Sequence, residues 1–295
     1  MRIIDDLPPL REVIAKYDLS ARKSLGQNFL FDLNLTSSIA RLAGDLTQYN
    51  ILEIGPGPGG LTRSLLALGA RRVIVIERDV RCLCALDEIA AIYPTRLKVV
   101  HANALDIDPK EYVQKPMKII ANLPFNIATE LLIKWLTTEQ WPPIWKSMTL
   151  MFQREVAERI VARPDTKAYG RLSILSQWRT NARLVKILPP EVFTPKPQVS
   201  GAVVTFEALS KDFFPADIRL LQEVVSKAFN QRRKMLRTTL KGYFTDIETT
   251  LASIGIHPTT RAENVSVEKY CELARKISKN TVNENGCKNE SHQQK

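Results

Sequence analysis

Short apolar segments that alternate with helical patterns constrain the fold of this chain more than any other feature. The first, Asn50–Ile54, runs into the glycine-rich turn Gly55–Gly60, and leucines spaced along one face of a helix follow. Strand and helix patterns then alternate through about residue 140. This alternation is typical of an α/β fold with a doubly wound, mostly parallel sheet. Two late strands, at 184–188 and 202–206, have no good helix between them and predict an antiparallel edge.

The glycine turn and the acid after it predict an adenosine-containing cofactor. The turn at 55–60 has the pattern G-x-G-x-x-G, and Glu77 ends the next strand, where a ribose-binding acid belongs. A tight turn beside a surface acid would give the same letters. Pro56 and Pro58 remove two backbone N–H groups that a pyrophosphate would need, so the turn suits the phosphate-free S-adenosylmethionine better.

Polar groups follow two further strands at the same edge of the predicted sheet. The tetrad Asn122-Leu123-Pro124-Phe125 presents an amide, backbone carbonyls and an aromatic ring at one point, which suits an amino group on a flat heterocycle. An ordinary strand-to-helix turn with a buried aromatic is the alternative. Asn103 follows the third strand, where its amide could accept from an adenine amino group or cap a helix.

The charge of the chain favours a polyanionic partner. Its 295 residues carry 42 Lys and Arg against 31 Asp and Glu, a net charge of +11. Nucleic acid is a better candidate than a membrane surface. The alternative is that the charges only keep the surface well solvated. The four cysteines show no metal-like pair and no disulfide framework, and no apolar run reaches membrane-spanning length. We therefore expect a cytoplasmic protein with no metal site and no membrane contact.

Five motifs resemble, in the family's order, those of the KsgA (RsmA) family of ribosomal RNA adenine dimethyltransferases, and the match extends from about residue 15 to 277. They are KSLGQNFL at 23–30, LEIGPGPGGLT at 52–62, NLPFNI at 122–127, F-x-P-x-P-x-V at 193–199 and NQRRKMLR at 230–237. The resemblance implies a class I S-adenosylmethionine-dependent methyltransferase with a Rossmann-like sheet and a small all-α C-terminal domain. It also implies dimethylation of N6 on two adjacent adenines in the 3′-terminal hairpin loop of 16S rRNA, and a role in small-subunit biogenesis.

The chain divides into four predicted parts. The periodicity becomes purely helical after Leu209, which predicts a domain boundary near Ser210, and residues 281–295 are polar and lack large apolar side chains. We expect an N-terminal helical and loop segment that closes over the cofactor site, a methyltransferase domain, a helical domain that binds RNA or the ribosome, and a disordered tail. Their predicted ranges are 1–45, 46–209, 210–280 and 281–295.

Roles for individual residues follow from the resemblance. Asn28 and Leu30 are expected to close over the cofactor, Gly55 and Gly57 to let the backbone approach it, Glu77 to take the ribose, Asn103 the adenine, and Asn122 both cofactor and target. Family members usually have Asp where Asn103 stands, which puts the adenine contact in doubt. They usually have Tyr where Phe125 stands, so the stacking face survives without a hydroxyl.

The target adenine is expected to meet the tetrad. The Asn122 side chain and a carbonyl of Leu123 or Pro124 would accept both N–H bonds of the amino group. Phe125 and Phe193 would stack on opposite faces of the base and offset the cost of extruding it. Phe193 as an ordinary core residue is the alternative.

Two basic sets predict where RNA binds to a monomeric enzyme, with solvated helix faces as the alternative. They are Arg154, Arg159, Arg163, Lys167, Arg171, Arg179 and Arg183, and then Arg232, Arg233, Lys234 and Arg237. Three other functions stay open at this point: methylation of DNA or large-subunit rRNA, a nicotinamide-dependent oxidoreductase based on the glycine turn, and a ribosome-assembly factor in which methylation is secondary.

Overall fold

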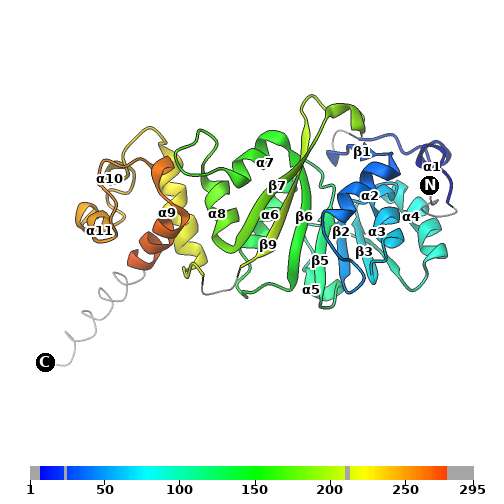
Figure 1. Ribbon diagram of the computed structural model, residues 1–295, viewed down its shortest axis with the longest axis horizontal. Helices are drawn as coiled ribbons and strands as arrows, with labels where there is room; N and C mark the ends of the chain where they lie inside the picture. The colour runs from blue at the N-terminus through cyan, green and yellow to red at the C-terminus, as the bar shows by residue number, and fades with distance from the viewer. Residues whose placement is uncertain (1–6, 23–24, 210–212, 278–295) are drawn as a thin grey trace, which may run out of the picture. The chain divides into compact units, whose positions relative to one another are not determined.

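The apolar segments form the strands of one seven-stranded sheet (Figure 1). The structure is a computed structural model and describes residues 7–22, 25–209 and 213–277. In spatial order the strands are β4 (Leu97–His101), β3 (Arg72–Glu77), β2 (Asn50–Ile54), β5 (Met117–Ala121), β6 (Trp145–Gln153), β9 (Gly201–Ala208) and β7 (Thr180–Leu188).

The pairing of the strands confirms the predicted topology. β4, β3, β2, β5 and β6 run parallel, and β9 pairs with β6 in the antiparallel direction. β9 and β7 are the two late strands of the sequence, so the antiparallel edge is confirmed as well. β2 and β5 are buried at all five positions, as is typical of parallel strands that are covered on both faces.

Helices connect these strands and bury their apolar stripes. The helices of this part of the chain are α1 (Leu10–Lys16), α2 (Leu33–Arg41), α3 (Gly60–Ala67), α4 (Val80–Ile92), α5 (Pro109–Tyr112) and α6 (Ala128–Leu136). A further helix, α7 (Arg154–Val161), begins in this part, and its residues from Glu158 belong to the second unit. α2, α3 and α4 share one core cluster with alternate residues of the strands, among them Ile51, Val73 and Val75. Burying these side chains is the main force that holds the helices on the sheet.

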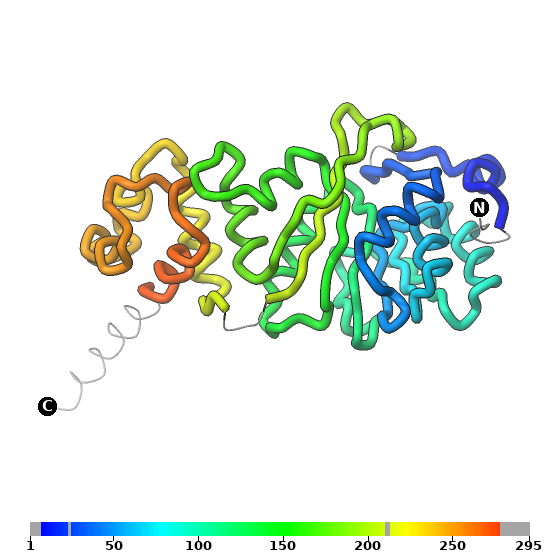
Figure 2. The backbone as a smooth tube through the Cα atoms, in the orientation of Figure 1, coloured from blue at the N-terminus to red at the C-terminus, as the bar shows by residue number. Residues whose placement is uncertain are grey.

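Two very short strands join segments far apart in the sequence. β1 (Phe29–Leu30) pairs antiparallel with β8 (Phe193–Thr194), which follows the 3-10 turn Pro190–Val192. Figure 2 shows the dark blue N-terminal trace beside the yellow-green trace around residue 190. The sequence predicts only loops here, because a strand of two residues has no periodicity to detect.

A second compact unit contains the remaining helices. They are α8 (Arg171–Arg179), α9 (Ile218–Asn230), α10 (Leu236–Thr239), α11 (Ile247–Ser253), the 3-10 turn Ala262–Asn264 and a helix at 267–277. Contacts divide the chain into a sheet unit (1–157 and 181–208) and this helical unit (158–180 and 209–295).

The helical unit includes one segment that the predicted ranges assign to the methyltransferase domain. Residues 158–180 lie between two strands in sequence, but their core residues Tyr169, Ile174 and Trp178 share a cluster with the C-terminal helices. Two hydrogen bonds reinforce the grouping. Tyr169 Oη donates to Val265 O over 2.9 Å, and Trp178 Nε1 donates to Phe214 O over 2.7 Å.

Some predictions fall outside the described residues. The tail at 281–295 is one, and the predicted boundary near Ser210 is another. No stretch of helix among the described residues combines the length and the hydropathy that a membrane crossing requires.

Candidate active site

A pocket of about 1010 Å³, open to solvent, lies where four parallel strands of the sheet unit end. The sequence predicted that the residues after these strands would share one crevice, and they do. Predicted site residues that line it are Asn28, Leu30, Gly55, Gly57, Glu77, Asn103, Asn122, Leu123 and Pro124. Ligands of doubly wound sheets bind at this edge, and the volume admits a nucleoside-sized cofactor.

The glycine turn after β2 uses its N–H groups within the protein. Gly55 N donates to Ile76 O, Gly57 N to Glu77 Oε2 and Gly59 N to Pro56 O, at distances between 2.9 and 3.0 Å. Pro56 and Pro58 have no N–H to offer. The turn is therefore poor at holding a pyrophosphate, as the sequence predicted, and it fits a cofactor without phosphate.

Two glycines of the turn, Gly55 and Gly57, allow side chains of the protein to pack closely against the backbone. Gly57 has φ +55°, and a Cβ added there would lie 2.7 Å from Cε1 of Phe29. Gly55 has φ +64°, and its Cβ would lie 3.2 Å from Cδ of Pro124. The glycines thus bring the N-terminal segment and the tetrad against the turn, which shapes two walls of the pocket.

Glu77 is a buried acid that is held by backbone donors. Its carboxylate accepts from the N–H groups of Gly57, Arg78 and Asp79 at 2.8–3.0 Å, and the residue is 5% exposed. Burial raises the pKa of Glu77 above its ordinary value, and the three N–H donors oppose that rise. The carboxylate lies at the end of β3 in the pocket wall, where the sequence predicted a ribose contact.

Glu53 is a pocket residue to which the sequence analysis gave no role. It lies in β2 immediately before the glycine turn, is 1% exposed, and accepts a hydrogen bond from Thr62 Oγ1 over 2.7 Å. Burial raises the pKa of Glu53 to about 8. An acid within an otherwise apolar strand was the available signal, since such a residue needs a buried partner.

Asn103 caps a turn, which is one of the two roles that the sequence allowed. It lines the pocket, and its Oδ1 accepts from Leu105 N at 3.3 Å as a turn cap. Its Nδ2 donates to Asp106 Oδ2 over 2.9 Å. Because a carboxylate can only accept, Asp106 fixes the amide so that Oδ1 stays an acceptor, as an aspartate oxygen would be.

Asn122 lies at the end of β5, half-buried, and its Nδ2 donates to the backbone carbonyl of Asn28 over 2.8 Å. The two candidate carbonyls next to it differ. Pro124 O already accepts from Ile127 N at 3.1 Å, whereas Leu123 O accepts no hydrogen bond from any described residue. Of the two, Leu123 is better placed to accept from a ligand.

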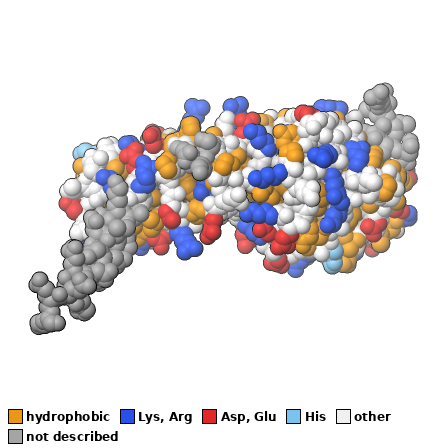
Figure 3. All heavy atoms as spheres, turned by 90° about the horizontal axis from the view of Figure 1, so that it is seen from below, with side chains coloured by type: hydrophobic (Ala, Val, Ile, Leu, Met, Phe, Trp, Pro, Cys, Tyr) orange, Lys and Arg blue, Asp and Glu red, His pale blue; other side chains and the backbone are white. Residues whose placement is uncertain are grey.

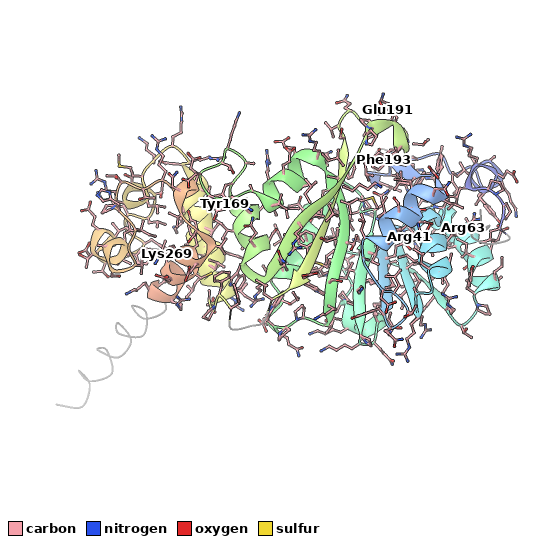
Figure 4. All side chains as sticks on the ribbon, in the orientation of Figure 1. Arg41, Arg63, Tyr169, Glu191, Phe193 and Lys269 are labelled. Carbon is pink, nitrogen blue, oxygen red and sulfur yellow. The ribbon has the colours of Figure 1, made fainter. Side chains whose placement is uncertain are left out.

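Phe125 and Phe193 meet each other directly. Their ring centroids are 6.2 Å apart with an interplanar angle of 69°, an edge-to-face contact. Phe193 is 2% exposed and belongs to the core cluster of the sheet unit, near Glu191 in Figure 4. Neither ring is among the described residues that line the pocket. A base could lie between the rings only after they separate.

The N-terminal segment is tied to the helices of the sheet unit by polar contacts. Arg63 of α3, labelled in Figure 4, donates to the carbonyl of Pro8 over 2.7 Å. Gln27 donates to Asp79, which is 5% exposed. Burial alone would raise the pKa of Asp79, but hydrogen bonds from Arg81 and Gln27 outweigh it and lower that pKa to about 2.

Comparisons with known proteins agree with this geometry. A family model described as "Ribosomal RNA adenine dimethylase" matches residues 18–279. The chain belongs to the ribosomal RNA adenine dimethylase family. A relative of this dimethylase from Ruegeria pomeroyi, named Ribosomal RNA small subunit methyltransferase A, is 63% identical over 279 residues, which cover 95% of this chain and all of the relative. A relative of the same name from Jannaschia sp. is 64% identical over 275 residues. The matched region covers 93% of this chain and 95% of the relative.

Two solved structures share the fold of the dimethylase. A dimethyladenosine transferase from Plasmodium falciparum has a TM-score of 0.73 at 22% identity, over 85% of this chain and 98% of that one. The 23S rRNA methyltransferase ErmE has a TM-score of 0.65 at 24% identity, over 85% and 100%. The predicted class I fold is confirmed, and the family uses S-adenosylmethionine. The oxidoreductase alternative is therefore excluded.

Proposed function

We propose that this dimethylase transfers methyl groups to N6 of two adjacent adenines in the 3′-terminal hairpin loop of 16S rRNA, within the small ribosomal subunit. Full-length relatives with identities of 63–64% carry a small-subunit name, which supports small-subunit rRNA over the large-subunit alternative. The 23S rRNA methyltransferase ErmE is only 24% identical to this chain, so the similarity supports the fold and not the substrate.

S-adenosylmethionine, when bound, supplies an electrophilic methyl group. We propose that Glu77 holds the ribose, that Asn103 accepts from the adenine amino group, and that Asn28 and Leu30 cover the cofactor. The support is that these side chains share one pocket, that the glycine turn keeps its N–H groups for the protein, and that Asp106 leaves Asn103 Oδ1 facing as an acceptor.

The tetrad carries the transfer step on the target side. The N6 lone pair of adenine is delocalised into the ring, so the amino group is a poor nucleophile. Asn122 Oδ1 and Leu123 O accept its two N–H bonds and favour a pyramidal nitrogen that points its lone pair at the methyl group. This is catalysis by positioning and electrostatics. The cationic product is acidic and releases its proton to water.

Aromatic stacking helps to offset the cost of base extrusion. Unstacking a base costs a few kcal/mol, and stacking on an aromatic ring returns about 1–3 kcal/mol. We propose that Phe125 and Phe193 take the two faces of the adenine after their edge contact opens. The half-buried position of Phe125 beside Asn122 supports this placement.

One observation carries the proposal. The Asn122 amide, directly after β5, is held by its hydrogen bond to Asn28, and the neighbouring carbonyl of Leu123 accepts no hydrogen bond from any described residue. Asn122→Ala should abolish methyl transfer while S-adenosylmethionine affinity stays within about a factor of three, because the pocket walls at Gly57 and Glu77 are untouched. Labelled S-adenosylmethionine and undermethylated small subunits, followed by mapping of the modified bases, measure this. Near-normal turnover, or label at other bases, would reject the proposal.

The RNA surface includes basic side chains of both units. Figure 3 shows Lys and Arg side chains on the face in view, with Asp and Glu side chains among them. In the helical unit two of the four clustered cations are already paired. Arg232 contacts Glu263 over 2.7 Å and Thr166 O over 3.3 Å, and Arg237 contacts Glu248 over 3.3 Å.

Arg233 and Lys234 are exposed and contact no carboxylate among the described residues. We propose that these two bind RNA phosphates, and that the enzyme acts as a cytoplasmic monomer with an additional part in subunit maturation. Comparing Glu77→Ala with the parent for both methylation and maturation separates the two roles.

A further inference from the structure

One end of the Asn122 amide is tied to the backbone of the N-terminal segment. Nδ2 of Asn122 donates to the carbonyl oxygen of Asn28 over 2.8 Å. A carbonyl can only accept, so the NH₂ end of the amide must face Asn28. The opposite end, Oδ1, accepts no hydrogen bond from the residues that the structure describes, and Asn122 lines the pocket.

The same segment rests on the turn that carries Asn122. Gly26 has φ +64°, and a Cβ added there would lie 2.4 Å from Oδ1 and 2.9 Å from Cγ of Asn126. Asn126 is four residues after Asn122 in the same turn. The backbone at Gly26 therefore packs on the Asn126 side chain, which is exposed, and the backbone N of Asn126 would lie 3.4 Å from the added Cβ.

On its other side the segment rests on the glycine turn of the cofactor half. The ring of Phe29 fills the space where a Cβ on Gly57 would lie, 2.7 Å from Cε1. Leu30 O lies 2.7 Å from the position of a Cβ on Gly60. Residues 26–30 thus touch both the cofactor half and the target half of one pocket.

We propose that the segment 25–30 is a positioning element for Asn122. The Asn28 carbonyl holds the NH₂ end of the amide, so that Oδ1 is presented to the N6 amino group of the target. With the segment displaced, the Asn122 amide is free to rotate. It could then present Nδ2, a hydrogen-bond donor, to the N–H donors of the target amino group. Because the segment also packs on the glycine turn, its position links the S-adenosylmethionine side of the pocket to the orientation of the Asn122 amide. This rests on the proposed role of Asn122 in accepting from the target.

Gly26→Ala tests the proposal against a matched control. The added methyl group strains the segment itself, because Gly26 has φ +64°, a conformation that a residue with a side chain rarely adopts. Gly44→Ala imposes similar strain at φ +72°, but its nearest atom, Lys118 Nζ, is 4.0 Å away. At saturating S-adenosylmethionine and small subunits, Gly26→Ala should slow transfer by about 10- to 100-fold, and Gly44→Ala by less than about twofold.

A second measurement reports on the hydrogen bond itself and needs no change in the segment. The side-chain amide resonances of Asn122, assigned by their loss in Asn122→Ala, give the hydrogen exchange of the one Nδ2 proton that faces the Asn28 carbonyl. Exchange should be slow in the parent and in Gly44→Ala, and fast in Gly26→Ala.

Three results would overturn the inference: fast exchange in the parent, an unchanged saturated rate in Gly26→Ala, or a lowered rate in Gly26→Ala with that amide proton still protected. Asn122→Ala separates this failure from that of the proposed function. If Asn122→Ala turns over normally, the target role of Asn122 is wrong, whatever the Gly26 variant does.

Discussion

Glu53 has a carboxyl group that the fold keeps neutral near pH 7. It is 1% exposed, contacts Thr62, and has its pKa raised to about 8, chiefly by burial and further by the charge of Glu77. A neutral acid between the glycine turn and Glu77 avoids placing two negative charges at the same pocket wall. The cost of ionising it falls on the folded state alone.

This cost predicts a pH-dependent stability. In the unfolded chain Glu53 ionises near its ordinary value of 4.5, and in the folded protein near 8. The folded state therefore holds more protons between these values, and the stability that Glu53 contributes is lost as pH rises through this window, by at most about 1.4 kcal/mol per pH unit.

Glu53→Gln keeps an acceptor for Thr62 and removes the titration. We expect its thermal unfolding midpoint to fall less than that of the parent between pH 6 and 8, as followed by circular dichroism. Parallel curves for the two proteins would contradict the assignment.

Individual site residues differ in how far the sequence can place them. Glu77 and Asn122 follow strands, so their edge of the sheet was predictable from strand direction alone. The contacts of Asn103 and Asn122 with Asp106 and Asn28 were not, because an amide's orientation depends on which partner the fold delivers. Sequence spacing carries no information on that choice.

The glycine turn between β2 and α3 joins two walls of the pocket, and Gly57 is the point where the turn meets Phe29. Gly57→Ala should raise the dissociation constant of S-adenosylmethionine by about tenfold or more, because the methyl group meets Phe29 and the positive φ costs about 1–2 kcal/mol. Isothermal titration calorimetry measures the change.

Gly69→Ala is the control for this variant. It has φ +87°, its added Cβ would meet Thr47 Cγ2 at 3.3 Å, and Gly69 does not line the pocket. It should lower stability with donor affinity kept within about twofold. Equal losses of affinity in both variants would show that backbone strain, and not the displacement of Phe29, is responsible.

The strands of the sheet could be predicted from the sequence. The two-residue strands and the unit to which residues 158–180 belong could not. The strands of the sheet bury enough apolar side chains to be read from their runs. β1 and β8 exist because two loops meet, so no local signal marks them. The place of 158–180 in the helical unit depends on long-range burial of Tyr169 and Trp178, and neither residue shows in sequence which neighbours will cover it.

The helical unit offers a test of RNA binding that separates direct binding from structural support. Arg233→Gln with Lys234→Gln should weaken affinity for small subunits. The slope of log affinity against log salt should fall by about one for each RNA phosphate that the variant no longer neutralises. The unfolding midpoint should stay that of the parent, because both side chains are exposed.

Arg232→Gln serves as the comparison, since it breaks the contacts with Glu263 and Thr166 that join segments far apart in the sequence. It should lower the unfolding midpoint. Filter binding at several salt concentrations and thermal scans give both quantities. An unchanged salt slope in the double variant would remove Arg233 and Lys234 from the RNA surface.

The edge contact between Phe125 and Phe193 has a bearing on what the enzyme accepts as a substrate. An adenine that stacks on both rings must first part them and expose Phe193, which is 2% exposed. A large RNA can meet that cost with interactions made far from the base, whereas a free nucleotide brings none. If the two rings stack on the target as proposed, we expect free adenosine and ATP to be poor methyl acceptors compared with an adenine held in ribosomal RNA.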